Sequence, residues 1–251
     1  MSEAPRQLRD ARVLLVGAGG LGSPAALVLA RSGVGAITVL DDDRVEATNL
    51  HRQTLFTDAD VGGLKAEAAA ERLEREADTC GHALRATPVI ERFLPDTAAD
   101  LLERHDLVVE GSDNYATKFL TADAAMIHGV PCVSAGAVRW SGWTLASVPR
   151  ASACLRCVFE DIPRGRVATC ATAGVAGPVL GVVGALEAAL ALRLLTRHER
   201  APAAAAGELW SYDALRGTLR AHRIAPRKGC PLCAGEIRDL HVGRYTAEDA
   251  A

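Results

Sequence analysis

A glycine-rich stretch in this sequence has the spacing of a phosphate-binding loop. GAGGLG at 17–22 follows a β-rich apolar run at 12–17 and precedes a helical pattern at 23–32. Glycines let the backbone turn tightly and approach a phosphate, and the helix that follows offers free N–H groups and the positive end of its dipole. Asp41 lies 19 residues beyond Gly22, at the end of the next predicted strand, where it can accept hydrogen bonds from ribose hydroxyls. The pattern predicts a nucleotide site, and by itself it favours an NAD-dependent oxidoreductase.

A cluster of cations and amides favours a nucleoside triphosphate instead. NLHRQ at 49–53 follows the acidic loop after Asp41, and Lys65 begins the next helix. A nicotinamide site has little use for several cations beside the pyrophosphate. Attack on a triphosphate needs them, because negative charge moves onto the phosphoryl oxygens and the leaving pyrophosphate. We therefore predict that Arg52 and Lys65 are functional.

GSDN at 111–114 follows a third buried run, DLVVEG at 106–111. The carboxyl ends of parallel strands line the ligand crevice of an open α/β sheet, so Asp113 there could hold Mg²⁺ against triphosphate oxygens. The alternative is that Asp113 or Asn114 simply caps the helix predicted from Tyr115. The sequence leaves the two interpretations open.

Two C-x-x-C pairs predict a structural zinc site. Cys154/Cys157 and Cys230/Cys233 have 72 residues between them, and each pair can chelate one side of a tetrahedral Zn²⁺. The first ten residues are polar and lack the apolar stretch of an export signal. The chain is therefore expected to be cytoplasmic, where paired cysteines indicate metal rather than disulfides.

Composition and patterning predict an α/β fold: a Rossmann-like, mostly parallel sheet extended by antiparallel strands. With 251 residues, 28 basic and 31 acidic side chains and a pI near 6.2, the chain has no basic surplus for nucleic acid. Strand and helix patterns alternate as far as residue 135. Around 137–148 and 208–224 the pattern is β without intervening helices. The uncharged run 167–186 favours a buried helix after a loop over a membrane span.

These motifs together resemble the MoeB/ThiF enzymes, bacterial relatives of ubiquitin-activating enzyme. The resemblance covers residues 11–234. It rests on GAGGLGSP at 17–24, LDDD at 40–43, NLHRQ at 49–53, Lys65, SDN at 112–114, both cysteine pairs and CATAGVAGPVLG at 170–181.

The resemblance implies an adenylyltransferase that uses ATP, Mg²⁺ and Zn²⁺. Its substrate would be the C-terminal Gly-Gly carboxylate of a ubiquitin-like (β-grasp) sulfur-carrier protein, which later becomes a thiocarboxylate. Matching positions imply the following roles: Gly17, Gly19, Gly20 and Gly22 line the phosphate loop, Asp41 holds the ribose, Thr48 and Asn49 contact the nucleotide, Arg52 and Lys65 stabilise the phosphates, and Asp113 supports Mg²⁺. Cys170, in a crossover loop at about 158–174, would take part in sulfur chemistry.

The chain departs from the family pattern at both ends. Relatives carry an N-terminal helix whose Arg reaches the partner's ATP site, whereas residues 1–10 here are expected to form a short arm. Residues 235–251 are expected to be a flexible tail, too short for the rhodanese domain of some relatives, so the sulfur donor is expected in trans. The resemblance also implies a homodimer, with no membrane partner. Three alternatives remain: an NAD-dependent oxidoreductase, a related enzyme that activates a tRNA or small-molecule carboxylate, and a non-catalytic scaffold.

Overall fold

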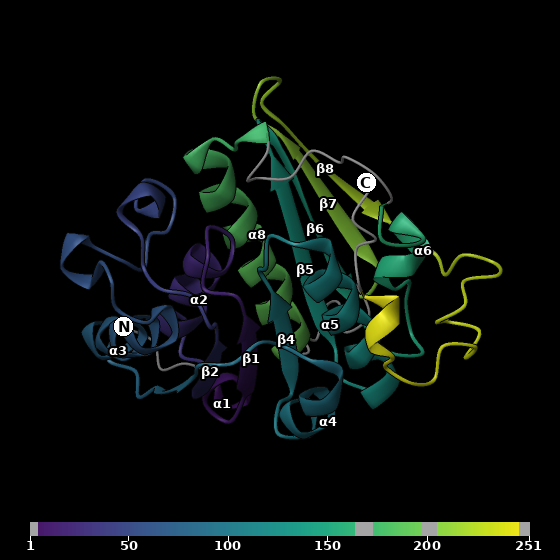
Figure 1. Ribbon diagram of the computed structural model, residues 1–251, viewed down its shortest axis with the longest axis horizontal. Helices are drawn as coiled ribbons and strands as arrows, with labels where there is room; N and C mark the ends of the chain where they lie inside the picture. The colour runs from purple at the N-terminus through teal and green to yellow at the C-terminus, as the bar shows by residue number, and fades with distance from the viewer. Residues whose placement is uncertain (1–4, 164–172, 197–204, 246–251) are drawn as a thin grey trace.

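The fold is built on one mixed sheet, seen in a computed structural model that describes residues 5–163, 173–196 and 205–245 (Figure 1). The strand order is β3-β2-β1-β4-β5-β6-β7-β8. The first five strands in that order are parallel, and β6, β7 and β8 continue the sheet antiparallel. The predicted fold class, a mostly parallel α/β sheet with an antiparallel extension, is confirmed.

The parallel strands at the centre are the apolar runs that the sequence singled out. Both faces of β1, β2 and β4 are covered, which is why their sequences lack polar alternation. The strands are β1 (Arg12–Val16), β2 (Ala36–Leu40), β3 (Arg85–Val89), β4 (Leu107–Glu110), β5 (Cys132–Val138), β6 (Ser141–Ser147), β7 (Glu208–Asp213) and β8 (Thr218–Arg223).

Helices cover both faces of the sheet. One hydrophobic core lies beneath α2 (Gly22–Arg31), α3 (Lys65–Thr79) and α8 (Gly177–Leu195), and a second lies beneath α4 (Pro95–Glu103) and α5 (Tyr115–His128) (Figure 1). Short helices complete the described chain: α1 (Arg6–Arg9), α6 (Leu155–Phe159), η1 (Ala47–Asn49), η2 (Asp58–Asp60) and η3 (Val242–Arg244).

The uncharged run contributes a helix that packs on the sheet. By length and composition, α8 is long and apolar enough to cross a membrane. However, Val183 and Ala188 on it are fully buried against the sheet and α2. A Cβ on Gly184 would lie 2.5 Å from Cγ of Pro24, which shows how closely α8 approaches α2. The expectation of a buried helix holds for this segment.

The C-terminal segment differs from the flexible tail expected at 235–251. Tyr245 is 6% exposed and joins the core beneath α4 and α5. Its hydroxyl donates to Oδ2 of the buried Asp123 at 2.9 Å. An aromatic ring and a buried hydrogen-bond acceptor hold the chain back against the domain as far as Tyr245, and sequence polarity alone does not reveal that anchor.

Candidate functional site

A cavity of about 1100 Å³ opens at the carboxyl ends of the parallel strands. It begins between β1 and β4, whose neighbours extend the sheet in opposite directions; this is the switch point where open α/β sheets bind ligands. Its lining includes the glycine loop, Arg52, Lys65 and Asp113, and continues past Trp143 to β7 and β8. The fold thus gathers in one cavity residues from widely separated stretches of sequence.

Two glycines of the loop, Gly17 and Gly22, fit their surroundings only without a side chain. Gly17 has φ +87°, and a Cβ there would lie 3.1 Å from the backbone nitrogen of Ser112. A Cβ on Gly22 would lie 1.9 Å from the carbonyl oxygen of Gly17. Gly17, Gly19 and Gly20 line the cavity, whereas Gly22 does not. The predicted role of Gly22 at the phosphates is therefore better described as permitting the loop to fold tightly onto α2.

Gly22→Ala is expected to reduce ATP affinity at least tenfold, because the added methyl group collides with backbone and must displace the loop. Isothermal titration with ATP measures the effect. Gly62→Ala is the control. A Cβ on Gly62 meets nothing within 4 Å, and its φ of +88° is close to that of Gly17, so this variant introduces backbone strain without a collision. Equal ATP affinity in the Gly22 variant and the wild type would contradict the expectation.

Asp41 binds the glycine loop directly. Its Oδ2 accepts from the Ala18 N–H at 2.8 Å, and its Oδ1 accepts from the Asp43 N–H at 2.9 Å. Burial raises the pKa of Asp41, while these hydrogen bonds and the charge of Lys65 act in the opposite direction. Asp41 lines the cavity at the position predicted for a ribose contact, and the structure adds that it ties β2 to the phosphate loop.

The two predicted cationic side chains line the cavity, but the predicted nucleotide contacts Thr48 and Asn49 do not. Arg52 and Lys65 line it, and the Lys65 ammonium donates to Oδ2 of Asp43 at 2.7 Å. Asn49 lies outside the lining and accepts from Nη2 of Arg52 at 2.5 Å. Thr48 is exposed and donates to Glu46 at 3.3 Å. The structure therefore gives Asn49 contact with Arg52 and places Thr48 away from the cavity wall.

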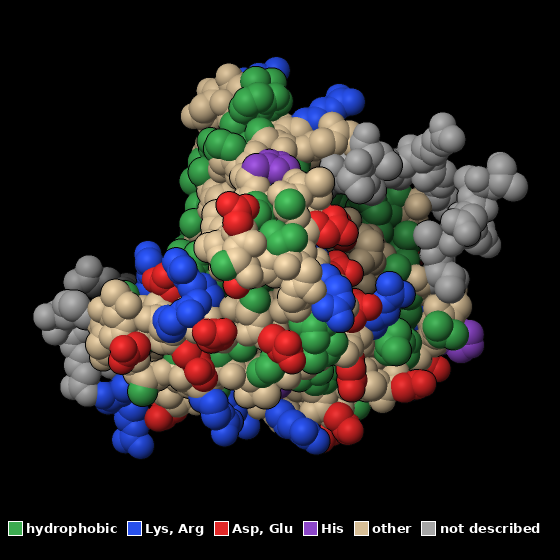
Figure 2. Space-filling model, turned by 60° about the vertical axis from the view of Figure 1, so that its left-hand side comes forward, with side chains coloured by type: hydrophobic (Ala, Val, Ile, Leu, Met, Phe, Trp, Pro, Cys, Tyr) green, Lys and Arg blue, Asp and Glu red, His purple; other side chains and the backbone are tan. Residues whose placement is uncertain are grey.

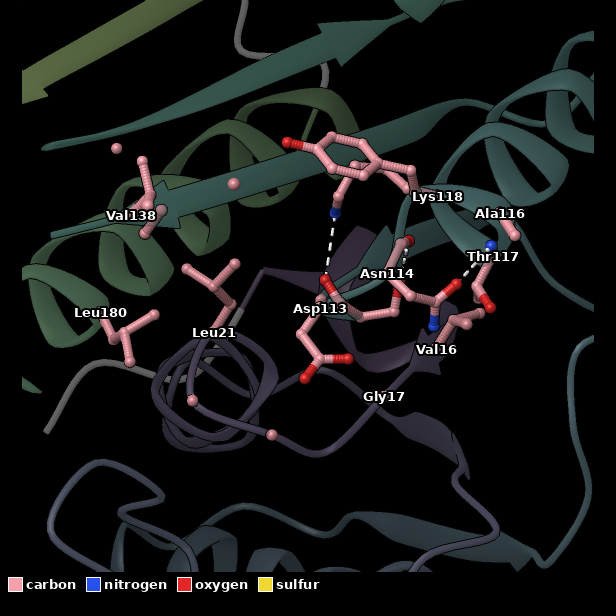
Figure 3. A pocket seen from close by; sticks show the side chains of 18 of the residues that line it. Val16, Gly17, Leu21, Asp113, Asn114, Ala116, Thr117, Lys118, Val138 and Leu180 are labelled. Carbon is pink, nitrogen blue, oxygen red and sulfur yellow. Dashed lines mark hydrogen bonds between the residues drawn. The ribbon is translucent and has the colours of Figure 1, made fainter. Parts of the chain in front are cut away.

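The sequence left open whether Asp113 binds Mg²⁺ or whether Asp113 or Asn114 caps α5, and the structure assigns the cap to Asn114. The Asn114 side chain accepts from the Thr117 N–H at 2.8 Å and caps α5. The Asp113 carboxylate points toward the glycine loop (Figure 3). In the part of the chain that the structure describes, no residue donates a hydrogen bond to that carboxylate. Its oxygens suit a hard cation such as Mg²⁺.

A buried ion pair beside Asp113 was not predicted. Lys118 on α5, which lines the cavity, pairs with the fully buried Glu110 at the end of β4. Lys118 also donates to the carbonyl oxygens of Ser112 (3.1 Å) and Ala135 (2.6 Å). A lysine three residues after a helix start looks like a solvated charge in sequence, so no local signal indicates this pair.

A second buried carboxyl group, Glu187, lies on α8. Neither of its oxygens has a hydrogen-bond partner among the described residues. Burial, followed by the charge of Glu110, raises the pKa of Glu187 well above its ordinary value of 4.5, and Lys118 opposes the shift. Burial without a hydrogen-bond partner therefore favours the protonated form of Glu187 in the folded protein.

Glu187→Gln is expected to stabilise the protein increasingly as pH rises. Above pH 4.5 the unfolded chain loses the Glu187 proton while the folded protein keeps it, and this difference disfavours the folded wild type by about 1.4 kcal/mol per pH unit up to the raised pKa. Glutamine has no proton to lose. Urea unfolding between pH 5 and 8 measures the difference, with the exposed Glu67→Gln as control. A pH dependence identical to that of the wild type would refute a raised pKa for Glu187.

The four paired cysteines meet in one cluster. Their sulfur atoms lie within 4.8 Å of one another, with separations of 3.7 Å for Cys154–Cys157, 3.6 Å for Cys154–Cys230 and 3.5 Å for Cys157–Cys233. Tetrahedral zinc with Zn–S bonds of about 2.3 Å needs sulfur atoms about 3.8 Å apart. Burial and the neighbouring sulfurs raise the pKa of Cys233 to about 12, so a cation is needed to hold the thiolates. The donor set fits a closed, structural metal site.

A buried network joins this cluster to the cavity wall. Arg156, between the first two cysteines, donates through Nε to both oxygens of Asp123 on α5 (2.9 and 3.0 Å). Asp123 also accepts from Tyr245, which lines the cavity. The sequence analysis missed this network, because its members are far apart along the chain. Cys170, predicted for sulfur chemistry, lies outside the described residues, as does most of the predicted crossover loop.

A glycine loop at the switch point of a mixed sheet, together with a separate four-cysteine cluster that could hold a metal ion, defines an α/β protein of the nucleotide-binding class. The ThiF family matches residues 2–232, and the chain belongs to that family. The predicted resemblance is confirmed.

Curated relatives agree with this assignment, and a solved structure shares the fold. A sulfur carrier protein adenylyltransferase of Thermus thermophilus is 38% identical over 98% of this chain and 90% of its own. The adenylyltransferase and sulfurtransferase uba4 of Emericella nidulans is 39% identical over 92% of this chain and 49% of its own, so the chain spans about half the length of that relative. The relatives support the predicted class, an adenylyltransferase of this family. A crystal structure of MccB from E. coli shares the fold, with TM-score 0.76, 21% identity, and coverage of 90% of this chain and 68% of that one.

Proposed function

We propose that this protein uses MgATP to adenylate the C-terminal Gly-Gly carboxylate of a ubiquitin-like sulfur-carrier protein. A carboxylate oxygen of the carrier attacks the α-phosphorus, the bond from that phosphorus to the bridging oxygen breaks, and pyrophosphate leaves. The product is an acyl adenylate, which a later sulfur donor converts into a thiocarboxylate. No general base is needed, because a carboxylate is ionised at neutral pH.

The observation that carries the proposal is the chemistry gathered around one end of the cavity. Arg52, Lys65 and the glycine-loop amides supply positive charge where a triphosphate would shed pyrophosphate. Asp113 offers its free carboxylate to Mg²⁺, which would neutralise phosphate oxygens when bound. Zn²⁺ at the four cysteines would hold the C-terminal part of the fold in place and take no part in the reaction.

The length of the cavity supports a carrier protein as the second substrate. Beyond the nucleotide end the cavity runs past Trp143 to Ser211 and Arg220 on the antiparallel strands. Its volume of about 1100 Å³ exceeds what a nucleotide requires. An extended peptide tail could lie along the far half and bring its terminal carboxylate to the phosphates. The name of the Thermus relative supports the same substrate class.

ATP–pyrophosphate exchange in the presence of candidate carriers tests the proposal. We expect exchange that depends on a carrier ending in Gly-Gly and that vanishes when those two residues are deleted. The same assay with small carboxylates and tRNA tests the related carboxylate-activating enzymes. Absence of exchange with every acceptor, together with tight NAD binding, would overturn the proposal.

We also propose a cytoplasmic homodimer that receives sulfur from a separate protein. Three large apolar side chains are exposed near α8 and the strand turns: Val182 (37%), Trp140 (49%) and Leu215 (73%). The turns lie side by side, because the Ala214 N–H donates to the carbonyl oxygen of Trp140 at 2.9 Å. Figure 2 shows apolar side chains at the top of the molecule, where the β7–β8 hairpin ends. Sedimentation equilibrium tests the homodimer, and a monomer at micromolar concentration would contradict it.

A further inference from the structure

The segment that carries Asp113 is attached to the domain by one buried side-chain cluster. Glu110 ends β4, and Asp113 follows three residues later on a loop that faces the cavity. The loop itself is exposed at Asp113 and Asn114, so packing does not hold its tip. The Asn114 cap holds the backbone after Asp113, and contacts to Ser112 hold the backbone before it.

Ser112 supplies that attachment through each of its polar groups. Its N–H donates to Oε1 of Glu110 at 2.9 Å, and its hydroxyl donates to the same oxygen. Its carbonyl oxygen accepts from the Lys118 ammonium at 3.1 Å. The other Glu110 oxygen pairs with Lys118, so the two charged residues hold Ser112 from both sides.

Lys118 in turn ties three elements together. It is 6% exposed, and its three N–H donors meet three acceptors: Glu110 at the end of β4, the Ser112 carbonyl, and the Ala135 carbonyl on β5. An ammonium has three donors and no acceptor, so its hydrogen-bonding capacity is filled within the protein. Lys118 therefore has no donor left for a phosphate, although it lines the cavity (Figure 3).

From this geometry we propose that Glu110 and Lys118 are positioning residues: they clamp Ser112 so that the Asp113 carboxylate faces the metal-bound nucleotide. The proposal deepens the proposed function and rests on it, because it assigns to Asp113 the support of a divalent cation. Preorganised groups cost no rearrangement when the metal–nucleotide complex binds. A clamp made of two buried charges is stiffer than a surface loop because the alternative to pairing is an unpaired buried charge.

The main test is the double variant Glu110→Gln/Lys118→Met, which removes both charges together and so leaves no unpaired ion. Glutamine keeps an acceptor oxygen near Ser112, whereas the contact of Lys118 with the Ser112 carbonyl is lost. We expect the Kd of Mn²⁺ in the ternary complex with ATP, measured by electron paramagnetic resonance, to rise at least tenfold. The Kd of ATP without metal, measured by titration, should stay within threefold of wild type, because the glycine loop is untouched.

Two further variants keep the test decisive. Ser112→Ala removes the hydroxyl group, which donates to Glu110 and at 3.4 Å to the Asn114 carbonyl oxygen, without burying a charge. We expect a smaller rise in the Mn²⁺ Kd, about threefold, with an unchanged melting temperature. Lys228→Met, an exposed lysine far along the chain, is the matched control and should change neither constant. If the double variant fails to fold, the Mn²⁺ Kd of the Ser112→Ala variant alone tests the clamp.

The outcomes separate this proposal from the proposed function. Unchanged Mn²⁺ affinity in the folded variants overturns the clamp, and so does an equal loss of metal-free ATP affinity, because that result would indicate a general disturbance of the site. Both measurements are independent of the acyl acceptor. Failure of pyrophosphate exchange with every carrier would overturn the proposed function and leave the metal-binding result standing.

Discussion

Cys230→Ser is expected to release the metal ion and lower the melting temperature of the protein by about 10–20 °C. Cys230 is 1% exposed and its sulfur lies 3.6 Å from that of Cys154, so it contributes a ligand from the C-terminal end of the chain. Structural zinc sites contribute about 10–16 kcal/mol of binding free energy that exists in full only when the protein is folded. A loss of about 5 kcal/mol after partial compensation corresponds to that shift for a chain of this size.

The loss of bound metal and of thermal stability should be specific to the four-cysteine cluster. Metal analysis should find one zinc per wild-type chain and much less than one in the variant, and calorimetry should follow the melting temperature. Cys80→Ser is the matched control, because Cys80 ends α3 away from the cluster. A Cys230 variant that keeps one zinc and melts with the wild type would show that the cluster is not a metal site.

Asp113→Asn is expected to reduce carrier-dependent pyrophosphate exchange by about 10²–10³-fold, the range seen when one preorganised electrostatic contact to a reacting centre is removed. Asparagine keeps the size of the side chain and removes the charge that we assign to Mg²⁺. Because Asn114 rather than Asp113 caps α5, the helix should keep its start and the melting temperature should be unchanged.

The control for Asp113→Asn is Asp78→Asn, which makes the same chemical change at an exposed position near the end of α3. Steady-state exchange rates at several Mg²⁺ concentrations should show a defect in the Asp113 variant that high Mg²⁺ partly relieves. Exchange at the wild-type rate in the Asp113 variant would remove that residue from the proposed mechanism.

Much of the site could be predicted because its signals are local. A strand, a glycine loop and a helix are adjacent in sequence, so the GAGGLG motif and its flanking residues are sufficient to predict the conformation of the loop. Asp41 and Asp113 follow buried strands directly, and in a parallel sheet such positions must lie at one edge. Each cysteine pair is also local, and two pairs in one chain are sufficient to predict a common metal site.

Other features could not be predicted because they depend on contacts between distant segments. Glu110 and Lys118 look like ordinary charges until β4, β5 and α5 bury them together. The tail seemed flexible because its composition is polar, and only Asp123, 122 residues away, reveals why Tyr245 is buried. Thr48 matched a family position, yet it is exposed and does not line the cavity.

The sequence by itself therefore determined the α/β class, the nucleotide loop, the four-cysteine pattern and the family, since each depends on periodicity or on residues close together in the chain. Only the tertiary structure decided which polar groups face the cavity and which hold the backbone behind it. That division depends on burial and hydrogen-bond pairing: an unpaired buried charge is costly, so the partner that the fold supplies determines whether a charged residue can serve as a clamp or must remain a solvated surface group.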